Sequence, residues 1–387
     1  MKKIFFISAG RSDFDRLKNI LSELDNSKKI ILYVFLTTEY YNKFFTYDLK
    51  KIKKKFNVLN NKKKSNRFED TPFQMIKNLS EDLSCLSKHV KKLKPDLILI
   101  AGDRYEMLLG PLVAIPNNIP TFHFFGGSIT EGAIDELIRH GLTKMSHFHY
   151  TILKKYKERV LQLGEESWRV KNIGMPNLNS KIRTIFKSRK VLSNELNFDL
   201  SKPFMLLTYH PVTLDLKNTK KHLKSLVEAI KYIDINAIVT YPNSDPKYKE
   251  IIKTFKKIFT NKKKFLFVKY LGEKKYFNLM KFAQFLIGNS SSGIVESASF
   301  KIPVINIGIR QKGKHIPKNV INANHNKASI IKAIKKAKSK SFRTFVKRVN
   351  NPYVSKIDFK KISNEILKTV LKKDLLKKKF INFKENV

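Results

Sequence analysis

Residues 121–150 contain a concentration of side chains that can move protons or bind anions. An apolar run ends there at Gly126 and Gly127. The ionisable residues that follow the two glycines are Glu131, Asp135, Glu136, Arg139 and His140. We expect one helix to carry them, with Asp135 and Arg139 on one face and Glu131 one turn earlier. Carboxylates beside an arginine and a histidine are suited to general acid–base chemistry.

The same stretch also allows a purely structural explanation. Its apolar residues would form the packing side of the helix, and they are Ile134, Leu137, Ile138, Leu142 and Met145. Ser128 and Glu131 fit the Ser-x-x-Glu capping box, and Asp135 with Arg139 fits an exposed helix ion pair. A functional interpretation therefore depends on which other segments the fold places beside these residues.

The composition favours a two-domain protein of a reducing compartment. The chain has 387 residues, of which 42% are hydrophobic, enough for sizeable cores. The single cysteine, Cys85, excludes an intramolecular disulfide. No apolar stretch approaches the ~18 residues that a membrane span needs, and Arg11 and Asp13 interrupt the apolar start too early for a signal peptide. We expect a cytoplasmic protein with no membrane partner.

The formal net charge of +46 is compatible with nucleic-acid binding. However, only 12 of the 78 basic residues are arginine, and the lysines are scattered rather than interleaved with aromatic residues. Lysine spread over the surface explains this pattern, so we expect no nucleic-acid partner. Four arginines instead fall in the motifs described here, where a planar guanidinium suits phosphate or carboxylate, and they are Arg11, Arg104, Arg139 and Arg310.

Short apolar runs alternate with helical stretches along the chain, which predicts parallel βαβ units. The strands expected in the first half are 4–8, 30–36, 96–101, 121–125, 148–153 and 170–173. Those expected in the second half are 204–209, 237–241, 265–270, 285–287 and 304–307. A hinge is expected at residues 174–177, which contain a glycine and a proline.

The predicted fold class is therefore α/β, with two Rossmann-like doubly wound domains facing a central cleft. We expect one domain over residues 1–175, a second over 176–355, and a helix with a lysine-rich tail over 356–387. Polar, glycine-rich loops follow most of the expected strands. Ligands of such sheets bind at the carboxyl ends of the strands, so these loops indicate one cleft between the domains.

The segment 288–293, Gly-Asn-Ser-Ser-Ser-Gly, is suited to binding a pyrophosphate. Hydroxyls and backbone N–H groups at a helix start bind anions, although a serine-rich helix cap explains the segment too. The residues that could hold phosphates and a ribose are Arg11, Ser290, Ser291, Ser292, Glu296 and Arg310. The loop is not followed by Lys-Ser/Thr, and Gly-x-Gly-x-x-Gly is absent, so we expect no nicotinamide or flavin cofactor.

Two further residues at strand ends add acid–base groups. Asp103 lies between Gly102 and Arg104, and His210 is followed by Pro211, which fixes the turn after it. We expect His123 to be a core residue. His147 and His149 alternate along a strand and so point to opposite faces. No cluster has the spacing of a zinc site, and we expect no metal.

Together these motifs carry a resemblance to a known family. In the first half they are Gly102-Asp103-Arg104, Gly126-Gly127, residues 130–135, Arg139-His140 and Thr143-Lys144. In the second half they are His210-Pro211-Val212-Thr213, Tyr241-Pro242-Asn243, residues 288–296 and Arg310-Gln311-Lys312-Gly313. In this order, over roughly residues 1–345, the chain resembles the UDP-N-acetylglucosamine 2-epimerase family, and most closely its hydrolysing branch, which serves sialic and legionaminic acid biosynthesis. The resemblance implies the two-domain fold of B-type glycosyltransferases, with a nucleotide-sugar in the cleft.

The resemblance also implies a mechanism. A base removes the proton at C2 of the sugar, the nucleoside diphosphate leaves by elimination, and water adds to the resulting glycal, which releases a free manno-configured sugar. The implied catalytic residues are Asp103, Glu131, Asp135, Arg139 and His210. The implied substrate- or nucleotide-binding residues are Arg11, Gly126, Gly127, Asn243, Ser290, Ser291, Ser292, Glu296 and Arg310. No cofactor is implied, and the assembly expected is a homodimer or homotetramer.

Two positions depart from the family pattern. Many hydrolysing members carry a carboxylate where this chain has Phe125 and Ser128. Either Glu131 or Glu136 takes that role, or the preferred substrate differs, or activity is weak. The alternatives are a non-hydrolysing UDP-N-acetylglucosamine 2-epimerase, a glycosyltransferase of the same fold and, more distantly, a basic nucleic-acid-binding protein.

Overall fold

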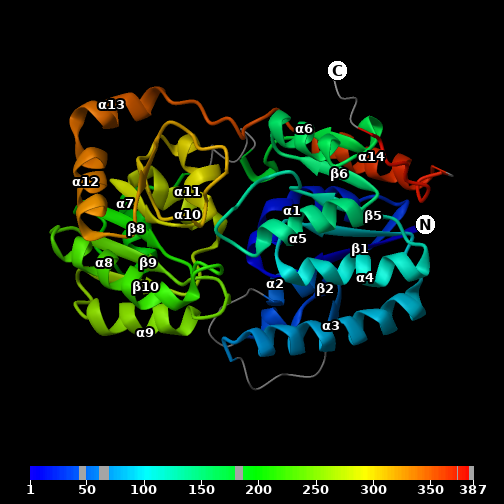
Figure 1. The fold of residues 1–387 in the computed structure, drawn as a ribbon, viewed down its shortest axis with the longest axis horizontal. Coiled ribbons are helices and arrows are strands. Elements are labelled where there is room, and N and C mark those ends of the chain that lie inside the picture. The colour runs from blue at the N-terminus through cyan, green and yellow to red at the C-terminus, as the bar shows by residue number, and fades with distance from the viewer. Residues whose placement is uncertain (43–48, 61–68, 179–185, 373, 383–387) are drawn as a thin grey trace. The chain divides into compact units, whose positions relative to one another are not determined.

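The computed structural model describes residues 1–42, 49–60, 69–178, 186–372 and 374–382, with the side chains of Arg11, Ser12 and Lys51 left out. Two compact units make up the chain. The first contains Met1–Ser128, Asp135–Asn179 and Ser355–Val387, and the second contains Ile129–Ile134 and Ser180–Val354. Each unit is built on its own parallel sheet (Figure 1).

The sheet of the first unit has seven strands in the order β3-β2-β1-β4-β5-β6-β7. The strands are β1 Lys2–Ser8, β2 Ile30–Leu36, β3 Asn57–Asn60, β4 Leu97–Ala101, β5 Thr121–Phe124, β6 Phe148–Thr151 and β7 Val170–Asn172. The helices are α1 Arg11–Asp25, α2 Leu49–Lys55, α3 Pro72–Leu93, α4 Leu109–Ala114, α5 Asp135–Met145, α6 Lys154–Gln162 and α14 Phe359–Val370. The strand order reverses direction beside β1 and β4, which is where ligands bind in doubly wound sheets.

The sheet of the second unit has six strands in the order β10-β9-β8-β11-β12-β13. The strands are β8 Phe204–Thr208, β9 Asn236–Thr240, β10 Phe265–Val268, β11 Phe285–Gly288, β12 Val304–Ile307 and β13 Val320–Ala323. The helices are α7 Arg189–Leu196, α8 Thr219–Lys231, α9 Tyr248–Ile258, α10 Gly272–Phe282, α11 Ser291–Val295, α12 Lys327–Lys338 and α13 Lys340–Arg348. The strand order reverses between β8 and β11. Two parallel sheets with alternating helices confirm the α/β fold expected from the sequence.

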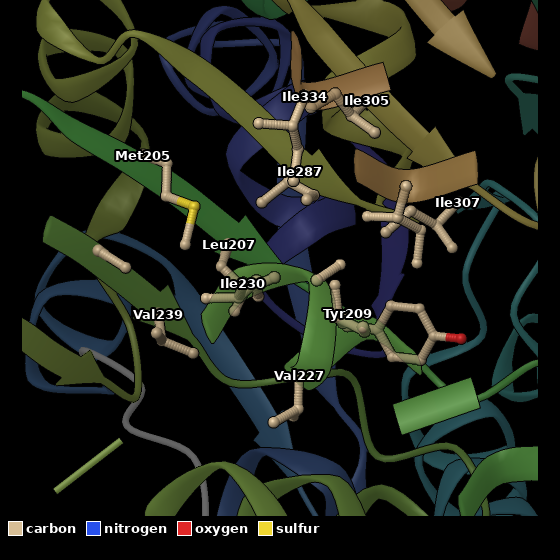
Figure 2. Packing of buried hydrophobic residues seen from close by; sticks show 14 of the residues in the cluster. Met205, Leu207, Tyr209, Val227, Ile230, Val239, Ile287, Ile305, Ile307 and Ile334 are labelled. Carbon is tan, nitrogen blue, oxygen red and sulfur yellow. The ribbon is translucent and has the colours of Figure 1, made fainter. Parts of the chain in front are cut away.

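Apolar runs of four to five residues form the core of the second unit because its strands are covered by helices. Side chains from β8, β11 and β12 pack there with those of α8 and α12, as Figure 2 shows for Leu207, Ile287, Ile305 and Ile334. Burying one such side chain stabilises a fold by about 1.5–3 kcal/mol. Tyr209 lies at the edge of the cluster, and its hydroxyl points away from the labelled aliphatic side chains (Figure 2).

The helix expected after Gly126-Gly127 begins later than the sequence predicted. α5 starts at Asp135, so Glu131 is not part of it. The segment Ile129–Ile134 instead makes hydrogen bonds within the second unit: Glu131 N donates to Lys312 O at 3.0 Å, and Ile134 N donates to Thr213 Oγ1 at 3.0 Å. These bonds replace the ones that an additional helical turn would form.

The packing stripe predicted on α5 is confirmed for Leu142, Ile138 and Met145, which lie in or against the core of the first unit, but not for Leu137. Leu137, expected in the apolar stripe, is 82% exposed, whereas Arg139 is fully buried. The explanation of Asp135 and Arg139 as an exposed surface ion pair is therefore wrong. The buried Arg139 cation is stabilised by its bonds to the carboxylates of Asp103 and Glu136.

The C-terminal segment from Ser355 onward clusters with the first unit, whereas the sequence predicted a separate helix and lysine-rich tail over residues 356–387. α14 packs against α1. Arg169 is buried, and its Nη1 and Nη2 donate to the carbonyl oxygens of Leu375 and Lys377 at 2.8 and 2.7 Å. Within the described ranges, no helix combines the length and the hydrophobicity needed to span a bilayer.

Candidate active site

Arg139 links two carboxylates in the first unit. Its Nε and Nη2 donate to Asp103 Oδ2 at 3.0 and 2.5 Å, and its Nη1 donates to Glu136 Oε2 at 2.6 Å. Nη1 also donates to the carbonyl oxygen of Ser128 at 3.0 Å. Burial opposes the charge of the guanidinium, but Asp103 and Glu136 outweigh this effect and raise the pKa of Arg139. Arg139 therefore stays a cation, which orients Asp103 and cannot serve as a base.

Asp103 and Glu136 remain accessible at this site. Their side chains are 31% and 23% exposed. The second carboxylate oxygen of Glu136, Oε1, lies 3.0 Å from Nε2 of His140. Asp135 is the first residue of α5 and is half-buried. Glu136 was left out of the predicted site, although its spacing of three residues from Arg139 was a signal for their contact.

Glu131, predicted as a third catalytic carboxylate, belongs to the second unit. Its side chain is 49% exposed and forms an ion pair with Lys312, Oε2 to Nζ 2.8 Å. The next residue, Gly132, packs against the backbone of Ile309. A Cβ on Gly132 would lie 2.5 Å from the carbonyl oxygen of Ile309. The structure therefore holds Glu131 on the loop after β12, while Asp103, Asp135 and Arg139 belong to the first unit.

Gly126 and Gly127 allow close packing at the end of β5. A Cβ on Gly126 would lie 3.1 Å from Thr143 Oγ1, and one on Gly127 would lie 2.2 Å from the carbonyl oxygen of Tyr156. Gly127 also has a φ of +78°, which side chains disfavour. Phe125, just before, adopts a φ of +74°, a strained conformation for a bulky residue. Strain of this kind is typical of functional loops.

Gly127→Ala should lower the free energy of unfolding by about 2–4 kcal/mol, because it combines a left-handed backbone with a clash against main chain. Gly141→Ala is the matched control. The nearest atom to its Cβ would be Met145 Cε at 3.8 Å, and alanine inside a helix stabilises by about 0.5–1 kcal/mol. Urea unfolding measures both, and equal stabilities of the two variants would contradict this account of Gly127.

Asn289 organises the carboxyl end of the second sheet. It is fully buried, its Oδ1 accepts the N–H of His210 at 2.7 Å, and its Nδ2 donates to the His210 carbonyl at 2.9 Å. The carbonyl oxygen of Asn289 in turn accepts from Gln311 Nε2 at 2.9 Å and from Arg310 Nη1 at 3.4 Å. Asn289 thus fixes two predicted site residues, whereas the sequence indicated it only as part of the pyrophosphate-binding segment 288–293.

The hydrogen bonds of His210 define its tautomer. Nδ1 accepts the backbone N–H of Asn243 at 2.9 Å, so in the neutral ring the proton is on Nε2. The side chain is 5% exposed. A neutral His210 therefore presents a donor, which suits a phosphate oxygen and not proton abstraction by Nε2. Asn243 contributes through its main chain.

The serine-rich segment forms a short helix start, as expected. Ser290 caps α11, its hydroxyl accepting the N–H of Ser292 at 3.4 Å, and Ser291 is the first helical residue. Ser292 Oγ lies 2.8 Å from the hydroxyl of Tyr276, a residue that no sequence motif indicated. Glu296 is buried and is the C-cap residue of α11, so it ends this helix and does not lie inside it.

Arg310 is held beside this helix start. Its side chain is buried, and Nη2 lies 3.6 Å from Asp245 Oδ2. Its Nε is buried and has no hydrogen-bond partner among the described residues. A guanidinium with one buried donor unused is suited to an added anion, because leaving that donor unpaired costs about 1–3 kcal/mol.

The turn that precedes Arg11, the first residue of α1, is fixed by Asp13. The two carboxylate oxygens of Asp13 accept the backbone N–H groups of Ala9 and Gly10 at 2.7 and 3.0 Å. Burial raises the pKa of Asp13 to about 7, against the opposing effect of these bonds. The predicted phosphate contact of Arg11 itself concerns a side chain outside the described residues.

The structure thus brings the predicted residues together in two sets. Asp103, Asp135 and Arg139, with Gly126 and Gly127, lie at strand ends and on α5 of the first unit. The set in the second unit comprises Glu131, His210, Asn243, Ser290, Ser291, Ser292, Glu296 and Arg310. In the described part of the chain, no group of three or more His, Cys, Asp or Glu side chains could hold a metal ion.

Known proteins are similar to this chain in sequence and in fold. Residues 22–367 match the family model described as UDP-N-acetylglucosamine 2-epimerase. A Campylobacter jejuni GDP/UDP-N,N'-diacetylbacillosamine 2-epimerase (hydrolyzing) is 38% identical, with 98% of this chain and 99% of the relative aligned. A Legionella pneumophila UDP-N,N'-diacetylbacillosamine 2-epimerase (hydrolyzing) is 28% identical, over 88% and 90% of the two chains.

Solved structures of similar fold include a UDP-GlcNAc 2-epimerase from Methanocaldococcus jannaschii in complex with UDP-GlcNAc and UDP. It is 20% identical, with a TM-score of 0.76 and with 95% of this chain and 99% of that chain covered. The UDP-GlcNAc 2-epimerase from Neisseria meningitidis bound to UDP-GlcNAc has a TM-score of 0.74 at 16% identity, over 95% and 99% of the chains. At such identities these structures bear on the fold. The family itself is established by the match of residues 22–367 to the family model and by the 38% identity to the Campylobacter jejuni relative. The chain belongs to the UDP-N-acetylglucosamine 2-epimerase family.

Proposed function

We propose that this protein is a hydrolysing 2-epimerase that converts a nucleotide-linked 2-acetamido sugar to the free manno-configured sugar and a nucleoside diphosphate. The preferred substrate is a UDP- or GDP-linked 2,4-diacetamido-2,4,6-trideoxyhexose, with UDP-N-acetylglucosamine as the simpler alternative. The observation that carries the proposal is the 38% identity, over nearly all of both chains, to the Campylobacter jejuni enzyme with a diacetylbacillosamine substrate in its name.

The first unit supplies the acid–base groups in this proposal. A base removes the C2 proton, the C1–O bond to the diphosphate breaks, and a glycal with a C1–C2 double bond forms. Water then adds its oxygen to C1 while a proton returns to C2 from the opposite face, so one water is consumed for each nucleotide-sugar. Asp103, held by the Arg139 cation, and Asp135 are the acid–base residues proposed here, with Glu136 beside them.

The second unit supplies the nucleotide-binding groups. Departure of a diphosphate needs donors and cations that bind its oxygens more strongly as negative charge develops. His210 offers Nε2–H, Arg310 offers a buried guanidinium with an unused donor, and the start of α11 offers hydroxyls. Glu296 is proposed to bind the ribose and Glu131 to act as a third carboxylate.

A further relative supports the biological setting that we propose. An Escherichia coli polysialic acid biosynthesis protein P7 is 29% identical, over 100% of this chain and 97% of the relative. We place the free sugar product in the supply of sialic or legionaminic acids, in the cytoplasm, where nucleotide-sugars are made. A homodimer or homotetramer is the expected assembly.

Product analysis tests the proposal. Purified protein incubated with the UDP- and GDP-linked substrates should release a free 2-acetamido sugar and the nucleoside diphosphate in equal amounts, as measured by NMR. A sugar that stays attached to the nucleotide would indicate the non-hydrolysing epimerase, and a requirement for an acceptor would indicate a glycosyltransferase. Either result would contradict the proposed function.

A further inference from the structure

Two imidazole rings are stacked in the second unit close to the proposed nucleotide-binding loops. His222 lies in the first turns of α8, and His325 lies between β13 and α12. Their ring centroids are 3.6 Å apart, with an angle of 8° between the planes. His325 Nδ1 is 3.3 Å from the hydroxyl of Tyr209, and His222 Nε2 is 3.6 Å from Asp215 Oδ2. This pair has no role in the chemistry described so far.

The stack contacts the two loops that carry His210 and Arg310. Tyr209, which bonds His325, directly precedes His210 in the chain. Gly308, two residues before Arg310, has a φ of +74°, and a Cβ on it would lie 1.8 Å from Nε2 of His325. The ring of His325 is therefore packed directly on the backbone that follows β12. Asn289 bridges the same two loops through separate hydrogen bonds.

We propose that His325, stacked as a neutral ring on His222, is a positioning residue that holds the loops carrying His210 and Arg310 in the geometry that binds a nucleoside diphosphate. The identity of the ligand as a nucleoside diphosphate rests on the proposed function, whereas the positioning of the two loops by His325 does not. His325 acts through Tyr209 and Gly308 and needs no contact with the substrate.

The surroundings of His325 favour the uncharged ring. The charged and titratable groups that face it or its partners are His222 and Lys221 of α8, Tyr209 and Asp215 of the loop after β8, and Arg310 of the loop after β12. Burial lowers the pKa of His325 to about 4, His222 acts in the same direction, and Asp215 opposes both. Nε2 is buried without a hydrogen-bond partner among the described residues, so a proton there would be unpaired.

This arrangement has a defined pH dependence. The pKa of His325 in the folded protein is below its value of roughly 6.5 in an unfolded chain, so the unfolded or opened state binds the proton first. The contribution of the stack is therefore complete above about pH 6.5 and is lost as the pH falls toward about 4. Opening of the two loops should increase over this same interval.

His325→Phe tests the proposal, because phenylalanine keeps a flat ring for the stack but cannot bond Tyr209 or titrate. At pH 7 we expect amide hydrogen exchange to become about tenfold faster in peptides covering residues 209–213 and 308–313 and the Kd for UDP to rise about tenfold. In the wild type, exchange in these peptides should also accelerate from pH 7 to pH 5, after correction for the intrinsic rate. In the variant that step should be smaller, because position 325 no longer titrates while His222 still does.

The control is His89→Phe on α3 of the first unit, which removes a half-buried imidazole and should leave both peptides unchanged. If the phenylalanine variant loses its native circular dichroism, His325→Gln replaces it in the same comparison. Unchanged exchange of both loops in a folded His325 variant would overturn the proposal. A wild-type protein that binds no UDP would contradict the proposed function, while the exchange rates would still decide the role of His325.

Discussion

Replacing Asp103 with asparagine should lower kcat about a thousandfold, since a positioned acid or base contributes roughly 10²–10⁴-fold. The geometry should survive, because the amide oxygen of asparagine can still accept from Arg139, which also keeps its bonds to Glu136 and Ser128. Steady-state release of the nucleoside diphosphate measures the effect, with circular dichroism to confirm the fold.

Asp96→Asn is the matched control for this change. Asp96 precedes β4, at the opposite end of the strand from Asp103, and pairs with Lys2 Nζ at 2.7 Å. Its replacement should leave kcat unchanged. A kcat within tenfold of the wild type for folded Asp103→Asn would show that another residue performs the acid–base step.

The two amide replacements of His210 should lower kcat to different extents, because they preserve different nitrogen positions. Glutamine extends an N–H donor to about the place of Nε2, whereas asparagine offers an acceptor near the place of Nδ1, where Asn243 N donates. If Nε2–H binds the departing diphosphate, His210→Asn should lose about a hundredfold or more in kcat. His210→Gln should retain about tenfold more activity than His210→Asn.

Measured kcat and Kd for UDP separate these variants, and His89→Asn serves as the control away from the site. Equal activity of the glutamine and asparagine variants would contradict the assignment of Nε2 as the working donor. Greater activity of the asparagine variant would mean that His210 matters mainly by anchoring the loop of Asn243.

Sequence patterns were sufficient for the central strands. The runs expected at 30–36 and 304–307 coincide with β2 and β12, because strands covered on both faces are continuous apolar segments. The strands that were missed, β3 and β13, lie at the edges of their sheets, and each has only four residues, including polar ones. The other two edge strands, β7 and β10, were expected from the sequence, so the asparagines that interrupt the apolar runs of β3 and β13 explain the weak signal there.

The functional loops were harder to predict because long-range contacts determine them. Ser128 and Glu131 satisfy the local pattern of a helix start, yet the N–H groups of Glu131 and Ile134 bond to Lys312 and Thr213. Periodicity alone places residue 139 beside residues 135 and 136. It does not reveal that Arg139 is buried by its contact with Asp103, which lies 36 residues earlier.

The proposed chemistry makes one demand that glycosyl transfer and simple glycosidic hydrolysis do not share, namely exchange of the hydrogen at C2 with solvent. Incubation of the nucleotide-sugar with enzyme in deuterium oxide, followed by NMR of the released sugar, should show one deuterium at C2 in every product molecule. Free sugar that keeps its original C2 hydrogen would mean simple hydrolysis of the glycosidic bond, and the elimination mechanism built on Asp103 and Arg139 would then be wrong.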